Sequence, residues 1–244
     1  MIIFLRKRTL AGIGVLTAFF LCLSCIFAWG IAPPSVSSFA PGANPPSVVV
    51  IDPGHGGEDG GAVSSSGAEE SRINLDIALC LNQMLRFSGK RTLMTRSDAS
   101  SISDPGLSTI RERKVSDLKN RVKLVNDTEN AVLLSIHQNS LPSSPVTHGA
   151  QVFWNQQPGA DVLAKEIQDI LNTRINTERP KEPKEIPSSI YLMKHVQSPA
   201  VLVECGFLSN EAEAAKLQET PYQKKLAAVI AAGYLECLTG EKEP

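Results

Sequence analysis

The chain has 244 residues, of which 42% are hydrophobic and 20% are charged, and its formal net charge is −1. This balance is typical of a globular protein and argues against broad, non-specific binding to nucleic acid or to anionic lipid. After the N-terminal segment about 200 residues remain, which suits one domain with a sizeable core.

The first 33 residues differ in composition from the rest of the chain. A basic run, RKR at residues 6–8, precedes an apolar run at residues 9–32 that has no charged side chain. That run is long enough to cross a bilayer as a helix, and a basic flank before an apolar run is also typical of a secretory signal. We therefore expect residues 1–33 to be a signal peptide or a membrane anchor, with the body of the chain exported. Residues 34–46 are rich in proline and serine and are predicted to be a linker.

Beyond residue 46, short apolar runs alternate with amphipathic segments. In chain order, the patterns predict a strand at 47–52, a helix at 70–88, a strand at 91–96, a helix at 110–127, strands at 131–139 and 149–155, a helix at 160–175, strands at 189–195 and 200–207, and helices at 210–218 and 222–238. Residues 177–187 are predicted to be a loop. The alternation predicts an α/β fold, a single three-layer sandwich in which helices flank both faces of a mostly parallel, twisted sheet.

Two of the predicted helices are amphipathic. In the helix at 70–88, apolar residues recur at four-residue intervals: Ile73, Ile77, Leu81 and Leu85. In the helix at 110–127, the apolar residues predicted to share one face are Val115, Leu118, Val122 and Val125. We expect both apolar faces to be the buried ones.

Three of the five cysteines lie in the body of the chain, and none of these three belongs to a CxxC pair. They are Cys80, Cys205 and Cys237. Scattered cysteines in this number do not make a disulfide framework. We expect them to be buried free thiols, and the apolar neighbours of Cys205 argue against a role as a nucleophile.

Two of the four histidines come where predicted strands end. His55 lies in a glycine-rich loop after the first strand, and His137 lies near the polar end of the strand at 131–139. In α/β sheets, function collects where strands end in loops. Imidazole and carboxylate together are the ligands of catalytic zinc sites. The other two histidines, His148 and His195, are interpreted as surface or structural residues.

Several acidic residues could complete such a site, and spacing alone leaves the choice open. The candidates are Asp52, Glu58, Asp59, Glu69 and Glu70. The chain has no HExxH motif, so a zinc site would be built from residues far apart in the sequence. The glycine loop is neither a dinucleotide fingerprint nor a P-loop, and no GxSxG motif accompanies it.

Glu204 ends the apolar strand at 200–207. A carboxylate there is costly unless it is paired, hydrogen-bonded or turned toward a metal. Burial raises the pKa of a carboxyl group, which makes it a useful general base. The alternative is a glutamate that forms a salt bridge with a neighbouring loop.

Taken together and in order, four segments resemble a known family: VVVIDPGHGGEDGGA, EESRINLDIAL, LLSIHQN and AVLVECGFLSN. They are similar to the zinc-dependent N-acetylmuramoyl-L-alanine amidases, the amidase-3 family of bacterial wall hydrolases. The resemblance implies a catalytic domain at residues 47–240 that cleaves the bond between N-acetylmuramic acid and L-alanine in peptidoglycan.

The resemblance also implies roles for four residues. His55, Glu70 and His137 correspond to the family's Zn²⁺ ligands, and Glu204 corresponds to its catalytic glutamate. The register of the family's E-K-x-x-N-L pattern selects Glu70 among the acidic candidates.

One residue departs from that pattern, because Ser71 stands where the family has lysine. The neighbouring Arg72 is a candidate to compensate for the missing positive charge.

Four further polar residues are candidates for supporting roles, and three of them have two interpretations. Asp52 either orients His55 or caps its loop. Arg96 and Arg121 either bind peptide carboxylates or pair with local acids, and local pairing is favoured for Arg121, which lies on a charged helix face. Asn139 is a candidate hydrogen-bonding partner of the substrate.

The connecting segments resemble a narrower subgroup, the germination-specific amidases of endospore-forming bacteria, which act in spore cortex synthesis. That likeness implies an exported protein on the cortex side of the forespore, and a lipoprotein activator is a candidate partner. Two alternatives stay open: a zinc peptidase that cuts within the stem peptide, and a non-catalytic wall-binding module.

Overall fold

The computed structural model describes residues 47–239. The segments predicted to be a signal peptide or anchor (1–33) and a linker (34–46) lie outside the described residues. Within residues 47–239, no helix is both long enough and apolar enough to span a membrane.

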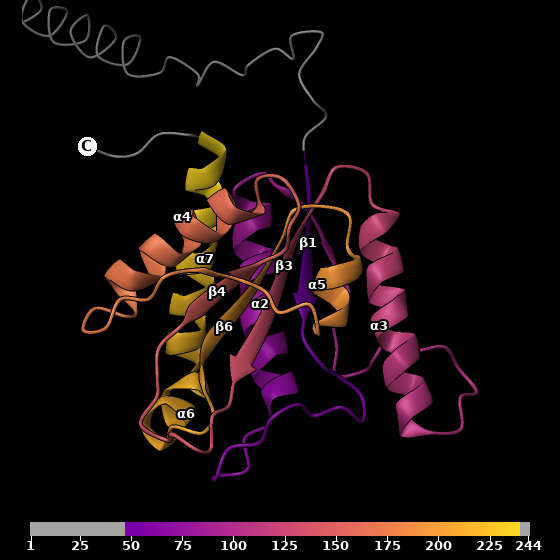
Figure 1. Ribbon diagram of the computed structural model, residues 1–244, viewed down its shortest axis with the longest axis horizontal. Helices are drawn as coiled ribbons and strands as arrows, with labels where there is room; N and C mark the ends of the chain where they lie inside the picture. The colour runs from indigo at the N-terminus through magenta and orange to yellow at the C-terminus, as the bar shows by residue number, and fades with distance from the viewer. Residues whose placement is uncertain (1–46, 240–244) are drawn as a thin grey trace, which may run out of the picture. The chain divides into compact units, whose positions relative to one another are not determined.

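Six strands of the described chain form one sheet in the order β2-β1-β3-β6-β4-β5. Their bounds are β1 (Val48–Pro53), β2 (Arg91–Met94), β3 (Ala131–Asn139), β4 (Gln151–Trp154), β5 (Lys184–Glu185) and β6 (Ala200–Phe207). The pairs β2–β1, β1–β3, β3–β6 and β4–β5 are parallel, and the pair β6–β4 is antiparallel. The carboxyl ends of β1, β3 and β6 therefore lie next to one another (Figure 1).

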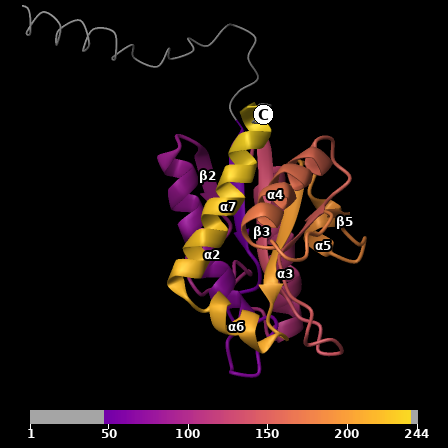
Figure 2. The same cartoon turned by 90° about the vertical axis from the view of Figure 1, so that its left-hand side faces the viewer.

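Helices cover both faces of the sheet, as predicted (Figures 1 and 2). One face carries α2 (Glu70–Phe87), α4 (Ala160–Arg174) and α7 (Thr220–Thr239). The other face carries α3 (Ile110–Asn126) and α5 (Tyr191–His195). The short α6 (Glu211–Leu217) follows the carboxyl end of β6.

The strand β1 shows how the sheet builds two cores. Val49 and Ile51 are fully buried in the larger core under α2, α4 and α7. Val50, between them in the sequence, is fully buried in the smaller core under α3 and α5. Alternate residues of a strand point to opposite faces, so a central strand needs apolar residues at every position.

The buried face of α2 is the predicted one, since Ile73, Ile77, Leu81 and Leu85 are all buried. The prediction for α3 is wrong at two of its four residues. Val115 is 45% exposed and Leu118 is 36% exposed, whereas the polar Asp117 and Arg121 are buried. Their burial is possible because both side chains are paired inside the protein. Arg121 forms salt bridges with Asp117 and Asp52.

The strand predicted at 189–195 is also wrong, because this segment contains the helix α5. Leu192 and Met193 are buried in the smaller core. A short run of apolar residues has no clear period, so it does not distinguish a strand from a single helical turn. Within the loop predicted at 177–187, the two residues of β5 pair with β4.

Candidate metal centre

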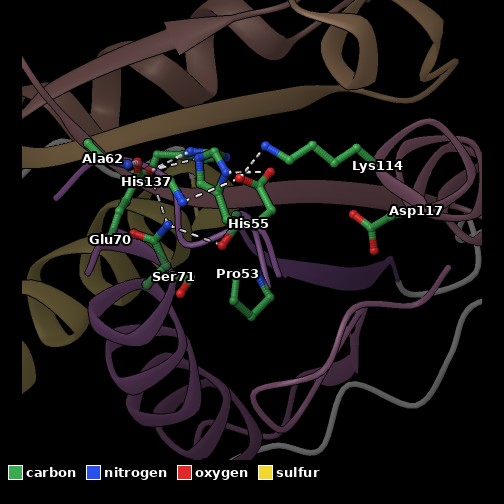
Figure 3. A network of polar contacts seen from close by, with 12 residues as sticks. Pro53, His55, Ala62, Glu70, Ser71, Lys114, Asp117 and His137 are labelled. Carbon is green, nitrogen blue, oxygen red and sulfur yellow. Dashed lines mark hydrogen bonds and ion pairs between the residues drawn. The ribbon is translucent and has the colours of Figure 1, made fainter. Parts of the chain in front are cut away.

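Three side chains from distant parts of the chain meet at the carboxyl edge of the sheet (Figure 3). His55 follows β1, His137 lies near the end of β3, and Glu70 is the first residue of α2. The Oε1 atom of Glu70 lies 2.9 Å from Nδ1 of His137 and 3.3 Å from Nε2 of His55. One ligand atom from each residue lies within 4.8 Å of the other two, so the three could hold a single ion.

The glycines of the loop make room for this convergence. A Cβ atom on Gly54 would lie 2.2 Å from the ring of His137, and one on Gly61 would lie 2.6 Å from Oε2 of Glu70. Neither distance is possible for a real side chain. His55 itself has a φ of 62°, a left-handed conformation that is uncommon outside glycine. A Cβ atom on Gly61 would also lie 2.8 Å from Cδ2 of His55, so the loop brings bare backbone against all three converging side chains.

Glu70 is held in place by groups from three directions. Its Oε2 atom accepts a hydrogen bond from the backbone N–H of Ala62 at 2.9 Å. Its Oε1 atom accepts from the N–H of Gln138 at 3.1 Å and from Nδ2 of Asn74 at 3.2 Å. Burial alone would raise the pKa of Glu70, but the hydrogen bonds and charges of His137 and His55 outweigh burial and lower it. The carboxylate is therefore ionised and oriented.

Asn74 is a site residue that the sequence did not predict. It is fully buried, and its Nδ2 also donates to the carbonyl oxygen of Gly54. Its Oδ1 accepts from Nε2 of Gln138 at 3.1 Å. The available signal was an amide within the apolar stripe of α2, next to Ile73, where only a hydrogen-bonded side chain is tolerated.

Asp59 contacts His55 from the side opposite to Glu70. Its Oδ2 atom lies 3.0 Å from Nδ1 of His55, and its Oδ1 atom lies 2.8 Å from Nζ of Lys114. Burial lowers the pKa of His55, but Glu70 and then Asp59 outweigh burial and raise it to about 9. A carboxylate on the second ring nitrogen is the usual way to fix the orientation of a metal-binding histidine.

Neither of the two interpretations of Asp52, orienting His55 or capping its loop, describes the contacts of its carboxylate. The Oδ1 atom of Asp52 accepts from Thr95 and from Nη1 of Arg121, and its Oδ2 atom accepts from Ser135. Asp52 is buried in the strand β1, one residue before its end, where it serves as the partner of Arg121.

The other acidic candidates lie outside the cluster. Glu58 pairs with Arg113 at 2.5 Å. Glu69 is exposed at the N-cap of α2. Of the five acidic residues that spacing left open, Glu70 is the one that meets both histidines.

Glu204 stands beside the cluster on the neighbouring strand. β6 pairs with β3 in a register that sets Glu204 opposite His137. The Oε2 atom of Glu204 is buried and has no hydrogen-bonding partner among residues 47–239. Burial raises the pKa of Glu204 to about 7; the charge of His137 opposes this shift and that of Glu70 adds to it. The alternative of a salt bridge to a neighbouring loop is therefore wrong.

The contacts of the two arginines differ from the prediction for Arg96 and confirm local pairing for Arg121. Arg96 is buried, and its guanidinium donates to backbone carbonyl oxygens, so neither predicted role describes it. Arg121 does pair with local acids, Asp52 at 2.6 Å and Asp117 at 2.7 Å. It is 2% exposed, however, and so it does not lie on a charged surface as the sequence predicted.

The remaining polar candidates lie at the margin of the site or away from it. The Oδ1 atom of Asn139 accepts from the N–H of Ser140. His148 and His195 are exposed, which agrees with their interpretation as surface residues. Cys205 is a buried free thiol whose pKa is raised by burial, and Cys80 and Cys237 are half-buried free thiols.

The residues fit a catalytic metal ion. Two imidazole nitrogens and one carboxylate oxygen make a three-ligand set of the kind that leaves a further position open for water or substrate. Burying the Oε2 atom of Glu204 without a hydrogen-bonding partner in the described part of the chain costs free energy. A hydrogen bond from a catalytic water, or protonation of the carboxylate, would reduce that cost.

Known proteins share this sequence pattern. The family model described as N-acetylmuramoyl-L-alanine amidase (Amidase_3) matches residues 49–236. The chain is 36% identical over 197 residues to the germination-specific N-acetylmuramoyl-L-alanine amidase of Bacillus subtilis, a match that covers 81% of this chain and 82% of that protein. It is 32% identical to the amidase LytC of the same organism, over 75% of this chain and 34% of LytC.

Solved structures share the fold. The CwlD amidase from Clostridioides difficile, solved in complex with the GerS lipoprotein, superposes with a TM-score of 0.76 at 34% identity, covering 80% of this chain and 100% of that one. An N-acetylmuramoyl-L-alanine amidase from Clostridium difficile 630 superposes with a TM-score of 0.69 at 28% identity, covering 82% and 100% of the two chains. The chain therefore belongs to the Amidase_3 family of N-acetylmuramoyl-L-alanine amidases.

Proposed function

We propose that this protein hydrolyses the amide bond between N-acetylmuramic acid and L-alanine in peptidoglycan, with Zn²⁺ held by His55, Glu70 and His137 and with Glu204 as the catalytic base. Membership of the family supports the reaction. The observation that carries the assignment of residues is the meeting of three ligand atoms within 4.8 Å beside a buried carboxylate oxygen that lacks a partner.

Each residue of the site has a defined task in this reaction. Zn²⁺ bound there would act as a Lewis acid that polarises the substrate carbonyl and lowers the pKa of water. Glu204 accepts the proton of the attacking water at Oε2 and then delivers it to the departing alanine nitrogen. In the metal-free protein the pKa of Glu204 is raised to about 7, which is in the range of a general base that works near neutral pH.

The residues around the ligands keep them in the required state. Asp59 accepts the Nδ1–H of His55, so that Nε2 faces Glu70 and would be available to bind Zn²⁺. Glu70 and Asp59 raise the pKa of His55 to about 9, so its ring would have to lose a proton in order to bind the metal. Asn74 keeps Oε1 of Glu70 directed at the histidines.

The biological setting is proposed from the relatives. The germination-specific amidase of B. subtilis supports a role in spore cortex modification. CwlD, which was solved with the GerS lipoprotein, supports a lipoprotein as activator. We further propose that residues 47–240 form the catalytic domain, and that residues 1–33 direct its export and provide either a cleaved signal or a membrane anchor.

Digestion of purified peptidoglycan tests this function. The full chain in mild detergent is incubated with peptidoglycan, with and without a chelator, and newly exposed amino termini are identified. We expect N-terminal alanine that disappears with the chelator and returns with Zn²⁺. A different amino terminus would identify a peptidase acting within the stem. The absence of any product, from protein that contains zinc and is supplied with the candidate lipoprotein, would contradict the proposal.

A further inference from the structure

Arg96 makes four hydrogen bonds, all to backbone carbonyl oxygens. Its Nε donates to Pro53 at 3.0 Å, and its Nη1 donates to Asp98 at 2.9 Å. Its Nη2 donates both to Gly54 at 2.9 Å and to Ser71 at 2.8 Å. Arg96 is only 5% exposed, so these bonds are made in the interior rather than in competition with bulk water.

Two of these carbonyl groups belong to neighbours of the metal ligands. Gly54 directly precedes His55, and both lie in the loop that follows β1. Ser71 directly follows Glu70 at the start of α2 (Figure 3). One nitrogen of Arg96 therefore links the segment that carries the first ligand to the segment that carries the second.

We propose that Arg96 is a positioning residue of the metal centre, which fixes the separation of His55 and Glu70 by cross-linking Gly54 to Ser71. The inference rests on the proposed function, because it assumes that His55 and Glu70 bind the ion. It assigns Arg96 to the assembly of the centre and gives it no contact with the substrate.

The chemistry of the guanidinium group suits this task. It is planar and presents five N–H donors in a fixed geometry, whereas a lysine ammonium is a point charge on a flexible stem. The loop is also shaped around Arg96: a Cβ atom on Gly56 would lie 2.9 Å from its Nε. His55, between Gly54 and Gly56, has its uncommon φ of 62° within this segment. Such a conformation persists only where its surroundings fix it.

Arg121 provides the contrast that makes the role of Arg96 specific. Arg121 also binds the β1 loop, at the carbonyl oxygens of Pro53 and His55. Its other partners are Asp52 and Asp117, and within residues 47–239 it makes no hydrogen bond to α2. Arg121 therefore anchors the loop to α3, whereas Arg96 connects the loop to the helix that bears Glu70.

The test is the zinc affinity of R96K, measured on metal-free full chain by competition with a chromophoric chelator. Lysine keeps the positive charge but has only three N–H donors, on a single nitrogen, for the four carbonyl groups that Arg96 serves from three nitrogens. We expect the dissociation constant for Zn²⁺ to rise about 10- to 100-fold, the usual effect of losing a group that orients metal ligands. Activity should return in part when Zn²⁺ is raised to saturate the variant.

The control is N155A: Asn155 directly follows β4 and lies beside Ala200, the first residue of β6, at the end of that strand remote from Glu204. Asn155 is buried and also binds backbone groups, the carbonyl of Ser198 and the N–H of Ala200. We expect N155A to lower the melting temperature and to leave zinc affinity unchanged. If Arg96 only stabilised the fold, R96K would likewise lower the melting temperature and leave zinc affinity unchanged. Wild-type zinc affinity in folded R96K would therefore overturn the proposal.

A second variant covers the case in which R96K does not fold. R96Q is neutral, is shorter than arginine and presents two N–H donors in place of five, so we expect it to bind zinc at least as weakly as R96K. If both variants stay unfolded at saturating Zn²⁺, Arg96 is required for the fold and the proposal is overturned. Failure of the wild-type chain to bind zinc would instead contradict the proposed function.

Discussion

The two helices α2 and α3 flank the β1 loop on opposite faces of the sheet, and they are buried in different ways. α2 packs an apolar stripe against the larger core and carries the buried Glu70 at its N-terminal end. α3 buries the charged Asp117 and Arg121 and leaves Val115 exposed. The first helix is stabilised mainly by the hydrophobic effect, and the second depends on pairing of buried charges.

The difference concerns function as well as stability. The Nη2 atom of Arg121 donates to the carbonyl oxygen of His55 at 2.6 Å, so the charged face of α3 lies directly under the metal-binding loop. The apolar stripe of α2 supports Glu70 from the other side. Each helix therefore holds one part of the centre, and substitutions on the two helices should differ in size and in pH dependence.

The largest expected effect comes from R121M on α3. Methionine fills part of the space but leaves Asp52 and Asp117 without their buried counter-charge. Breaking a buried ion pair from one side costs about 3–5 kcal/mol. We expect the free energy of unfolding, measured by urea titration at neutral pH, to fall by about that amount. A loss below about 1 kcal/mol would contradict the charge-based account of α3.

The matching change on α2 is L81A. Leu81 is fully buried in the larger core, so its truncation removes apolar contacts and leaves a cavity. We expect a loss of about 2–5 kcal/mol in the same titration, without a change in zinc affinity. An equal loss from truncation of the exposed Val162 would show that burial is not the cause.

Acid should separate the two variants. Burial raises the pKa of Asp52, but Arg121, Thr95 and Ser135 outweigh burial and lower it below 3.8. A lowered pKa contributes stability that is present above the unfolded value and is lost as pH falls through the folded value. In R121M the pKa of Asp52 should rise, so protonation relieves the unpaired charge. The stability difference between wild type and R121M should shrink from pH 7 to about pH 4.

The L81A variant is the control for that titration, because it removes no charge. Its stability difference from wild type should be the same at both pH values. A parallel decrease for L81A and R121M would indicate a general acid effect and would contradict a specific role for Asp52.

The smallest effect is expected for V115S on α3. Val115 is 45% exposed, although the sequence predicts that it is buried. Exposed substitutions of this kind change stability by about 0.5 kcal/mol or less. Thermal melts of V115S and of I77V should distinguish the two helices, since I77V at a fully buried position should cost about 0.5–1.5 kcal/mol. A larger loss for V115S than for I77V would reverse the comparison.

The sequence predicted those parts of the molecule in which apolar periodicity alone decides burial. The stripe of α2 and the central strands β1, β3 and β6 lie where the sequence places them. The burial of Asp117 and Arg121 could not be predicted in this way, because it depends on Asp52, which is distant in the sequence. The helix α5 was missed for a related reason: its few apolar residues fit a strand equally well, and only packing in the smaller core decides between the two.

The proposed metal ligands of the site were predicted from the sequence, but most of the contacts that support them were not. Residue chemistry identified His55 and His137 as candidates, and the family resemblance then chose Glu70 from several acids. The supporting contacts of Asp59, Asn74 and Arg96 arise only when the loop, α2 and the strand ends are in place. Asn74 and Glu70 are four residues apart on one helix, a spacing that makes them neighbours, but the contacts of Arg96 with the loop and with α2 join residues that are distant in the sequence and follow no spacing rule.

The most direct test of the central claim is the zinc content and activity of E204Q, with E69Q as the matched control. Glu69 is exposed and lies next to Glu70, so E69Q should keep both zinc and activity. We expect E204Q to retain stoichiometric zinc and to release N-terminal alanine from peptidoglycan at least about 10²-fold more slowly than wild type. Loss of zinc from E204Q would indicate that Glu204 is a metal ligand, and wild-type activity of E204Q would show that Glu204 is not the base. Either result would contradict the account.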